Sequence, residues 1–355
     1  MPYGTINADL MTTSDGVSSS GLYGFKNRII NGAMMIDQRN AGASVTPTTA
    51  SGYSLDRWVA RITQNSKLTI QQNAGAVTPP TGFTNYLGIT SSSAYSVLST
   101  DVFTLAQPIE GFNVADLGFG TASSSTVTLS FWVRSSLTGS FGGALVNNGG
   151  TRSYPFAYTI SLANTWEQKT VTIAGDTSGT WLKDNGVGLE IRFGLGAGSN
   201  YTGTANTWGT ANAAQPTSTV SIVGTNGATF YITGVQLEKG SIATSFDYRP
   251  YGTELALCQR YFEIVGATAN SVLFQTYAGG ATTGQQRSTF YYKATKRTSP
   301  TVTVFGTWSY SNAANLGVAS AGVDATRVEW DATAGGITFA YNQNAGSYLT
   351  ISAEL

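Results

Sequence analysis

Three carboxylates, Asp176, Asp184 and Glu190, lie close together in the sequence and are the residues best placed for chemistry. Glycoside hydrolysis needs two carboxylates on either side of one sugar bond, about 5 to 9.5 Å apart. However, Asp176 and Asp184 begin the sequences DTSG and DNG, in which an aspartate typically caps backbone N–H groups of a turn. We therefore interpret these carboxylates as structural and expect the chain not to be an enzyme, with a polysaccharide depolymerase as the least favoured alternative.

The composition excludes several other reaction classes. The chain contains no histidine, so Ser-His-Asp and Cys-His catalysis and histidine-bound metals are excluded. The single cysteine, Cys258, has no cysteine or histidine partner, and we interpret it as a packing residue. We expect no catalytic residue, no metal site and no cofactor, although a Ca²⁺ site formed by Asp and Asn side chains in turns stays open.

Sugar binding suits this sequence better, because aromatic rings stack on the apolar faces of sugars while amides and hydroxyls bond their hydroxyl groups. Trp181, Tyr201 and Trp208 lie in a stretch rich in Gly, Asn and Thr between residues 177 and 215. We predict that these three rings stand on exposed loops and bind glycan, with Tyr154 and Tyr158 nearby. The alternative, that Trp181 and Trp208 plug the ends of the fold, is equally open.

The elements that must position these rings read as strands. Charged residues make up only 11% of the chain and 42 residues are glycine, which favours short strands and turns over helices. Polar and apolar residues alternate at residues 54–62, 67–71, 125–134, 168–173, 188–193 and 228–233, and again in several segments after residue 271. The sequence therefore predicts an all-β protein, and we assign Trp58, Trp132 and Trp166 to its core. The glycine-rich run at 194–198 is interpreted as a loop, and residues 253–262 as a helix or a helical turn that leads into a strand.

Three passages resemble a family of phage tail-fibre and virion appendage proteins. They are NRIINGAMMIDQR at 27–39 with SLDRW at 54–58, then GVQLEKGSIATSFDYRP at 234–250, and ELALCQRYF at 254–262. The likeness extends over roughly residues 26 to 265. It implies a jelly-roll β-sandwich like those of carbohydrate-binding modules, followed by a β-rich tip, in a homotrimer.

We accordingly expect a short extended N-terminal attachment arm at 1–26, a jelly-roll domain at 27–250 and a smaller β-rich tip domain at 251–355. The expected function is host attachment by a structural virion protein that binds a cell-surface glycan as receptor. A purely architectural capsid decoration or fibre adaptor without a ligand is the alternative.

The charges bear on the partners of the chain. Nineteen basic and nineteen acidic residues cancel, so no net charge favours nucleic acid. The chain begins without the features of a signal peptide and has no apolar run of about 18 residues or more, so we expect synthesis in the host cytoplasm and no membrane insertion. A virion location is what the resemblance implies. The scarce charges at Asp56, Arg57, Asp247, Arg249, Glu254 and Arg260 either form ion pairs between domains or subunits or are solvated.

Overall fold

The computed structural model describes residues 26–48, 52–266, 268–270, 273–278, 284–342, 344 and 346–355. The chain divides into two compact units, and the second begins at Pro250. The attachment arm predicted at 1–26 lies outside the described residues, except for Lys26.

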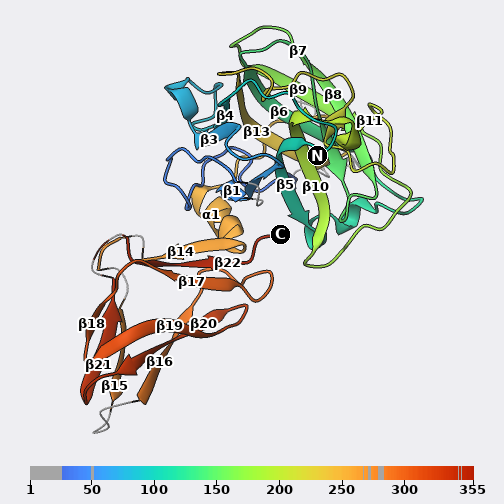
Figure 1. Cartoon of the computed structure of the whole chain (residues 1–355). Coiled ribbons are helices and arrows are strands. Elements are labelled where there is room, and N and C mark those ends of the chain that lie inside the picture. Colours follow the sequence, from blue (N-terminus) through green and yellow to red (C-terminus); the bar gives the residue numbers. More distant parts are fainter. Residues whose placement is uncertain are drawn as a thin grey trace, which may run out of the picture. The chain divides into compact units, whose positions relative to one another are not determined.

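Unit 1 is a jelly-roll β-sandwich of two antiparallel sheets, as the sequence predicts (Figure 1). The six-stranded sheet has the order β1-β2-β5-β10-β7-β8, and the five-stranded sheet has the order β3-β4-β13-β6-β9. The strands are β1 (Gly52–Leu55), β2 (Trp58–Ile62), β3 (Leu68–Gln72), β4 (Leu87–Ser91), β5 (Val102–Glu110), β6 (Val127–Ser135), β7 (Gly139–Val146), β8 (Ser153–Ile160), β9 (Glu167–Ile173), β10 (Val187–Ala197) and β13 (Thr229–Lys239).

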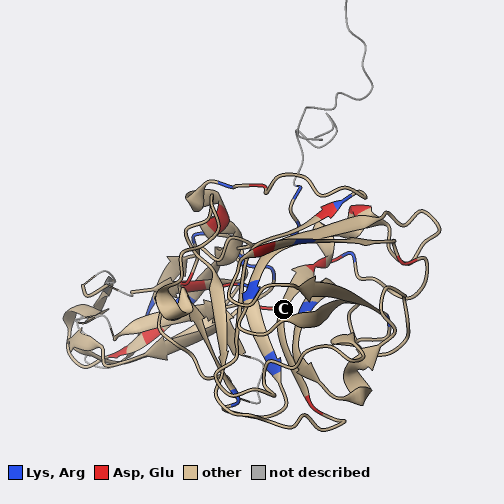
Figure 2. Ribbon diagram, turned by 90° about the horizontal axis from the view of Figure 1, so that it is seen from above, with Lys and Arg blue, Asp and Glu red and all other residues tan. Residues whose placement is uncertain are grey.

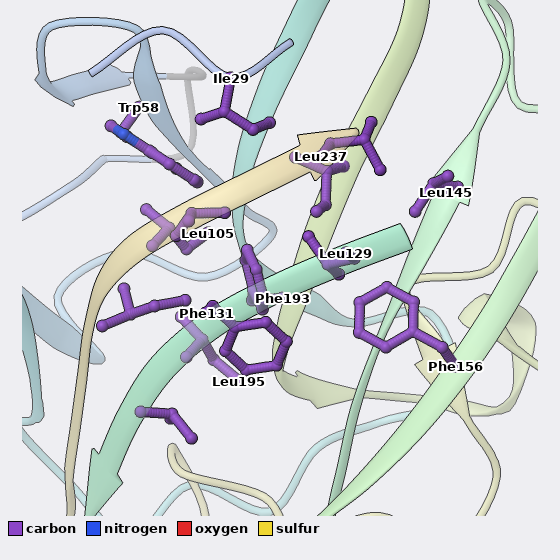
Figure 3. Packing of buried hydrophobic residues seen from close by; sticks show 14 of the residues in the cluster. Ile29, Trp58, Leu105, Leu129, Phe131, Leu145, Phe156, Phe193, Leu195 and Leu237 are labelled. Atoms are coloured by element: carbon purple, nitrogen blue, oxygen red, sulfur yellow. The ribbon is translucent and has the colours of Figure 1, made fainter. Parts of the chain in front are cut away.

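The core of unit 1 lies between these sheets. Alternate residues of each strand point inward, as the period of a pleated strand requires. Figure 3 shows Leu129 and Phe131 of β6 packed among Leu237 of the neighbouring strand β13 and Leu105 and Phe193 of the opposite sheet. Trp58 belongs to this cluster and is fully buried, so its assignment to the core is confirmed.

An irregular segment lies on the outer face of the six-stranded sheet. It contains the short parallel pair β11 (Thr202–Gly203) and β12 (Gln215–Pro216) and a 3-10 turn, Ser199–Tyr201. Gln215 packs on Gly194, where any side chain would collide with it, and Pro216 packs on Gly142 in the same way. The interpretation of 194–198 as a loop is therefore wrong, because residues 194–197 form the end of β10. The absence of a side chain at Gly194 allows the irregular segment to lie on the sheet.

The first and second family passages meet in one structure, which we call the clasp: residues 26–31 against residues 235–249. The backbone N–H of Arg28 donates to the carbonyl of Leu237 over 2.9 Å. The amide of Asn27 donates to the carbonyl of Val235 (3.0 Å) and accepts from the backbone N–H of Leu237 (3.1 Å). These bonds place the first described residues of unit 1 beside the strand β13.

The end of unit 1 is bound to the same place. Arg249 donates to the carbonyls of Asn27 and Ile29, and Lys26 donates to the carbonyl of Ser245 over 2.7 Å. The backbone N–H of Asn27 donates to the carboxylate of Asp247 at 3.3 Å. The first described residues of unit 1 and its last residues are therefore fastened to each other.

The two parts of the first passage also contact each other. Asn31, with a left-handed φ of 58°, donates to the carbonyls of Ile36 (2.8 Å) and Asp56 (3.0 Å), and its own carbonyl accepts from the indole N–H of Trp58. The carboxylate of Asp56 accepts two bonds of 2.7 Å from Gln38. The alternative that these charges are solvated does not hold for Asp56, which is fully buried inside unit 1.

Unit 2 begins with a helix that leads into a strand, as one of the two alternatives predicted. The helix α1 (Tyr251–Gln259) has Pro250 rather than Thr253 at its N-cap position, and β14 (Phe262–Val265) follows it. The remaining strands are β15 (Leu273–Ala278), β16 (Gly284–Tyr291), β17 (Thr301–Phe305), β18 (Ser309–Ser311), β19 (Ala313–Ala321), β20 (Ala325–Ala332), β21 (Gly336–Tyr341) and β22 (Tyr348–Ser352). They form three sheets, β14-β22-β17, β15-β21-β18 and β16-β20-β19, around a small core that includes Trp330 and Leu349.

A buried ion pair links the helix of unit 2 to its first strand. The ammonium group of Lys296 donates to the carboxylate of Glu263 over 2.9 Å and also to the carbonyl of Gln259, and both side chains of the pair are fully buried. The ammonium also lies 5.1 Å from the ring centre of Tyr292. Burial lowers the pKa of Lys296, although Glu263 opposes this shift.

Charged residues are sparse on both units. Figure 2 shows acidic and basic positions interspersed along a ribbon that is mostly uncharged. Among the described residues, no helix is long and apolar enough to cross a membrane.

Candidate functional site

The three residues predicted to bind glycan do not form an exposed site. The ring of Trp181 is buried, with 8% of the residue exposed, and lies 5.0 Å from the ring of Phe119 and 5.5 Å from that of Trp208. The ring of Trp208 is half-buried and also contacts Tyr154 at 5.2 Å. These four aromatic residues, Phe119, Tyr154, Trp181 and Trp208, form an aromatic plug.

Both indole groups of the plug are held by hydrogen bonds. Trp181 donates to the carbonyl of Ser178 (3.0 Å) and Trp208 to the carbonyl of Ala174 (2.7 Å). The prediction that these rings stand on exposed loops is therefore wrong, because the residues around them are irregular in conformation but folded back onto the sandwich. Tyr201 is half-buried in its 3-10 turn, and no ring contact joins it to the plug in the described part of the chain. Tyr154 and Tyr158 are buried as well.

The three candidate catalytic carboxylates are all engaged. Asp176 forms a two-pronged ion pair with Arg152, with both N–O distances 2.7 Å, and this bonding raises the pKa of Arg152. Asp184 accepts from the backbone N–H of Gly186, as its turn motif indicates. Glu190 lies between Arg61 and Arg192 on the outer face of the six-stranded sheet.

The charge state of Glu190 follows from this arrangement. Burial would by itself raise the pKa of Glu190, but the guanidinium groups of Arg192 and Arg61 outweigh it and hold that pKa below its ordinary value. Among the described residues, no group of three or more Asp, Glu or Cys side chains is placed to hold a metal ion.

The outer face of the five-stranded sheet presents a different set of side chains. On β6, Val127, Leu129, Phe131 and Val133 point into the core, so Thr128, Ser130, Trp132 and Arg134 point outward. Trp132 is half-buried rather than enclosed, so its assignment to the core is wrong. Its cross-strand neighbours are Thr233 of β13 and Gln168 of β9.

The third tryptophan assigned to the core, Trp166, has an intermediate position. It is half-buried and packs against a small separate cluster that includes Tyr86 and Tyr231, rather than between the two sheets. Its indole N–H donates to the carbonyl of Thr78 over 2.9 Å. Trp166 is therefore a packing residue, although it lies outside the main core.

The indole of Trp132 differs from every other indole in the chain. All seven tryptophans lie within the described ranges, and six of them donate their indole N–H to a carbonyl or hydroxyl oxygen. The indole N–H of Trp132 donates to no described residue, and its ring contacts no other aromatic ring among them. A buried tryptophan ordinarily has a partner for this donor. Trp132 therefore has both a partly exposed residue surface and an indole N–H that is available to a ligand.

Polar side chains surround Trp132 on this face. Gln168 and Thr170 of the edge strand β9 are exposed, and neither side chain bonds to another described residue. On the other side, Thr233 and Gln236 are buried, and their bonds to the carbonyl of Asn85 and to the carboxylate of Glu238 fix that wall of the face. An aromatic ring bordered by free amide and hydroxyl groups can stack on a sugar and bond its hydroxyl groups.

The sequence contained the signal for Trp132. In the segment 125–134 the alternation places Trp132 in phase with Thr128, Ser130 and Arg134, which is the polar set. Assigning it to the core on residue type alone overlooked this phase.

No protein-family model and no curated protein matches this chain. Among solved structures, it is similar to the enzymatically active domain of tailspike protein 4 of bacteriophage CBA120, with 13% identity and a TM-score of 0.32 over 55% of this chain. The chain covers only 21% of that domain. It is also similar to the xylan-binding domain of a Paenibacillus barcinonensis protein (12% identity, TM-score 0.29, 58% of this chain and 99% of that one). A third similar structure is the family 11 carbohydrate-binding module of Clostridium thermocellum (12% identity, TM-score 0.26, 55% of this chain and 95% of that one). The jelly-roll assignment rests on the strand order described above rather than on these distant likenesses.

Proposed function

We propose that this chain is a non-enzymatic virion protein, a component of a phage tail fibre or appendage, and that it binds a host-surface glycan on the outer face of its five-stranded sheet. The observation that carries this proposal is the partly exposed ring of Trp132 with its unused indole N–H. The sugar stacks on this ring, and Gln168 and Thr170 bond its hydroxyl groups. The virion assignment rests on the family passages, two of which form the clasp.

The rest of the assembly belongs to the same proposal. The arm at 1–26 attaches the chain to other virion proteins, and three copies form a homotrimer. A single stacked ring contributes on the order of 1 kcal/mol, by analogy with aromatic pairs. Binding by one site is therefore weak, and several linked copies supply the strength.

The state of the carboxylates supports a non-enzymatic role. The general acid of a glycosidase has a raised pKa, whereas the pKa of Glu190 is lowered by its two arginines. Asp176 is buried against Arg152 and has no free oxygen to offer a sugar bond.

The experiment is an array of bacterial surface polysaccharides probed with the purified chain and with Trp132→Ala. We expect the variant to bind roughly five- to tenfold more weakly per site. The matched control is Tyr291→Ala, which removes a ring that is 74% exposed on β16 of unit 2. Equal binding by the wild type and Trp132→Ala would refute this site.

The alternatives give different results. A wild-type chain that is incorporated into particles but binds no polysaccharide would be an architectural adaptor or decoration. Reducing sugar released from a capsule by the purified chain would instead show a depolymerase. Deleting residues 1–26 should leave both units folded but prevent incorporation of the chain into particles. If the truncated chain were found in virions at its normal copy number, residues 1–26 would not be the attachment segment.

A further inference from the structure

Arg134 lies two residues after Trp132 on β6, so both side chains leave the same face of the sheet. Their Cα atoms are about 7 Å apart, since a strand rises about 3.3 Å per residue. A ligand that stacks on Trp132 therefore passes within reach of Arg134.

Two contacts hold the guanidinium group of Arg134 in place. Its carbon lies 5.4 Å from the ring centre of Tyr231, which fits against β4 because Gly88 has no side chain there. Its Nε donates to the carbonyl of Asn164 over 2.9 Å. Asn164, with a φ of 57°, is itself fixed because its N–H donates to the carbonyl of Ser135.

The terminal nitrogens of Arg134 have no such partners. Neither Nη1 nor Nη2 donates to a described residue, and Arg134 forms no ion pair with any described carboxylate. Arg152, on the other sheet, shows what such a group does when a carboxylate is present, because it pairs with Asp176 through two bonds. The planar guanidinium fork matches carboxylate and phosphate groups better than any other side chain does.

The surrounding face does not repel an anion. The outward residues of β9 next to Trp132 are the uncharged Gln168 and Thr170. Glu238, the nearest acidic residue on β13, is buried and its oxygens accept bonds from Gln236 and Thr244. Arg134 is therefore the charged side chain nearest to Trp132 among the outward residues of β6, β9 and β13, because Glu238 lies opposite Thr128, four residues from Trp132 along β6.

We infer that Trp132 and Arg134 form one site for an acidic glycan, in which a sugar ring stacks on Trp132 and an anionic substituent of the glycan binds the terminal nitrogens of Arg134. The substituent is the carboxylate of a uronic acid or the phosphate of a phosphorylated sugar, which the fork binds in the same way. This inference rests on the proposed glycan binding and specifies its substrate class.

The test uses the full chain on an array of uronate-containing and phosphate-containing bacterial polysaccharides. Each polysaccharide is printed beside its own neutral form, made by carboxyl reduction or by dephosphorylation. We expect the wild type to bind the acidic form roughly tenfold or more tightly than the neutral form. Whether this preference is seen with the uronate-containing or the phosphate-containing polysaccharides identifies the substituent. Arg134→Gln should lose this preference while still binding the neutral form, whereas Trp132→Ala should weaken the binding of both forms roughly five- to tenfold per site.

The control is Arg327→Gln, which removes an exposed arginine from β20 of unit 2 and should leave the preference unchanged. Raising the salt concentration should weaken the wild type toward the level of Arg134→Gln, because the added contact is electrostatic. Equal binding of acidic and neutral forms by the wild type would overturn the role of Arg134 and leave the proposed function intact. A wild type that binds no polysaccharide on the array would overturn both.

Discussion

Replacing Trp208 by alanine should destabilise unit 1 and leave glycan binding unchanged, whereas replacing Trp132 should do the reverse. The ring of Trp208 contacts those of Phe119, Tyr154 and Trp181 at 5.2 to 5.9 Å, and its N–H donates to Ala174.

The magnitude follows from these contacts. A buried tryptophan replaced by alanine costs about 3 to 5 kcal/mol. Because Trp208 is half-buried, we expect about 2 to 3 kcal/mol, which corresponds to roughly 5 to 10 °C in Tm for a unit of this size. Trp208→Phe keeps the ring contacts and loses the hydrogen bond, so it should cost about 1 kcal/mol. Trp132→Ala removes no ring contact and no hydrogen bond within the described chain, and should cost at most about 1 kcal/mol.

The assay is urea unfolding of each variant, followed by tryptophan fluorescence, beside binding on the polysaccharide array. The slope of the free energy of unfolding against urea concentration should be the same for all variants, so that the midpoint urea concentrations report differences in stability directly. Full stability with lost binding in Trp208→Ala would refute the assignment of the plug. A loss of stability in Trp132→Ala as large as that in Trp208→Ala would refute the outward placement of Trp132.

Three further predictions concern the ion pairs and the assembly. Glu263→Gln should destabilise unit 2 by about 3 to 5 kcal/mol in urea unfolding, because it leaves the ammonium of Lys296 buried without its counter-charge. The double variant Glu263→Leu with Lys296→Met removes both charges and should largely restore stability. Because the pKa of Glu190 is lowered in the folded state, its ion pairs add to the free energy of unfolding of unit 1 at pH values above the ordinary pKa of a glutamate. This stabilisation is lost as the pH falls through the lowered pKa. Glu190→Gln should therefore flatten the dependence of the free energy of unfolding on pH in this acid range. The purified chain should be a trimer by light scattering at micromolar concentration, and a monomer with the arm intact would contradict the assembly.

The all-β sandwich could be predicted from the sequence because alternation and turn residues are local signals, whereas the jelly roll was expected only from the resemblance of the three passages. The strands β6, β9, β10 and β13 all fall where polar and apolar residues alternate. The candidate site at Trp132 was missed because tryptophan was assigned to the core by residue type alone, without asking whether its position in the alternation belongs to the apolar or to the polar set. Trp132 and Phe131 are adjacent aromatic residues in one strand, yet Trp132 is half-buried on the outer face of the sheet and Phe131 is fully buried in the core.

The irregular segment at 199–220 misled the prediction for a different physical reason. A stretch rich in Gly, Asn and Thr predicts a lack of regular structure, and this is what most of the segment has. It does not predict exposure, because a chain without a ladder can still pack on a sheet whose outer face is built from small residues. Gly142 and Gly194 provide such a surface. This match between two distant parts of the sequence becomes visible only in three dimensions.

The clasp has a mechanical consequence for a protein pulled from both sides. Tension between the chain before Lys26 and the chain after Arg249 enters and leaves unit 1 at adjacent residues. The force is carried by the bonds of Arg249 to the carbonyls of Asn27 and Ile29, of Lys26 to Ser245, and of Asn27 and Arg28 to β13, the strand at which the clasp meets the five-stranded sheet. The outer face around Trp132 on β6 should thus keep its shape under such a load, and the clasp should be the first part of unit 1 to yield.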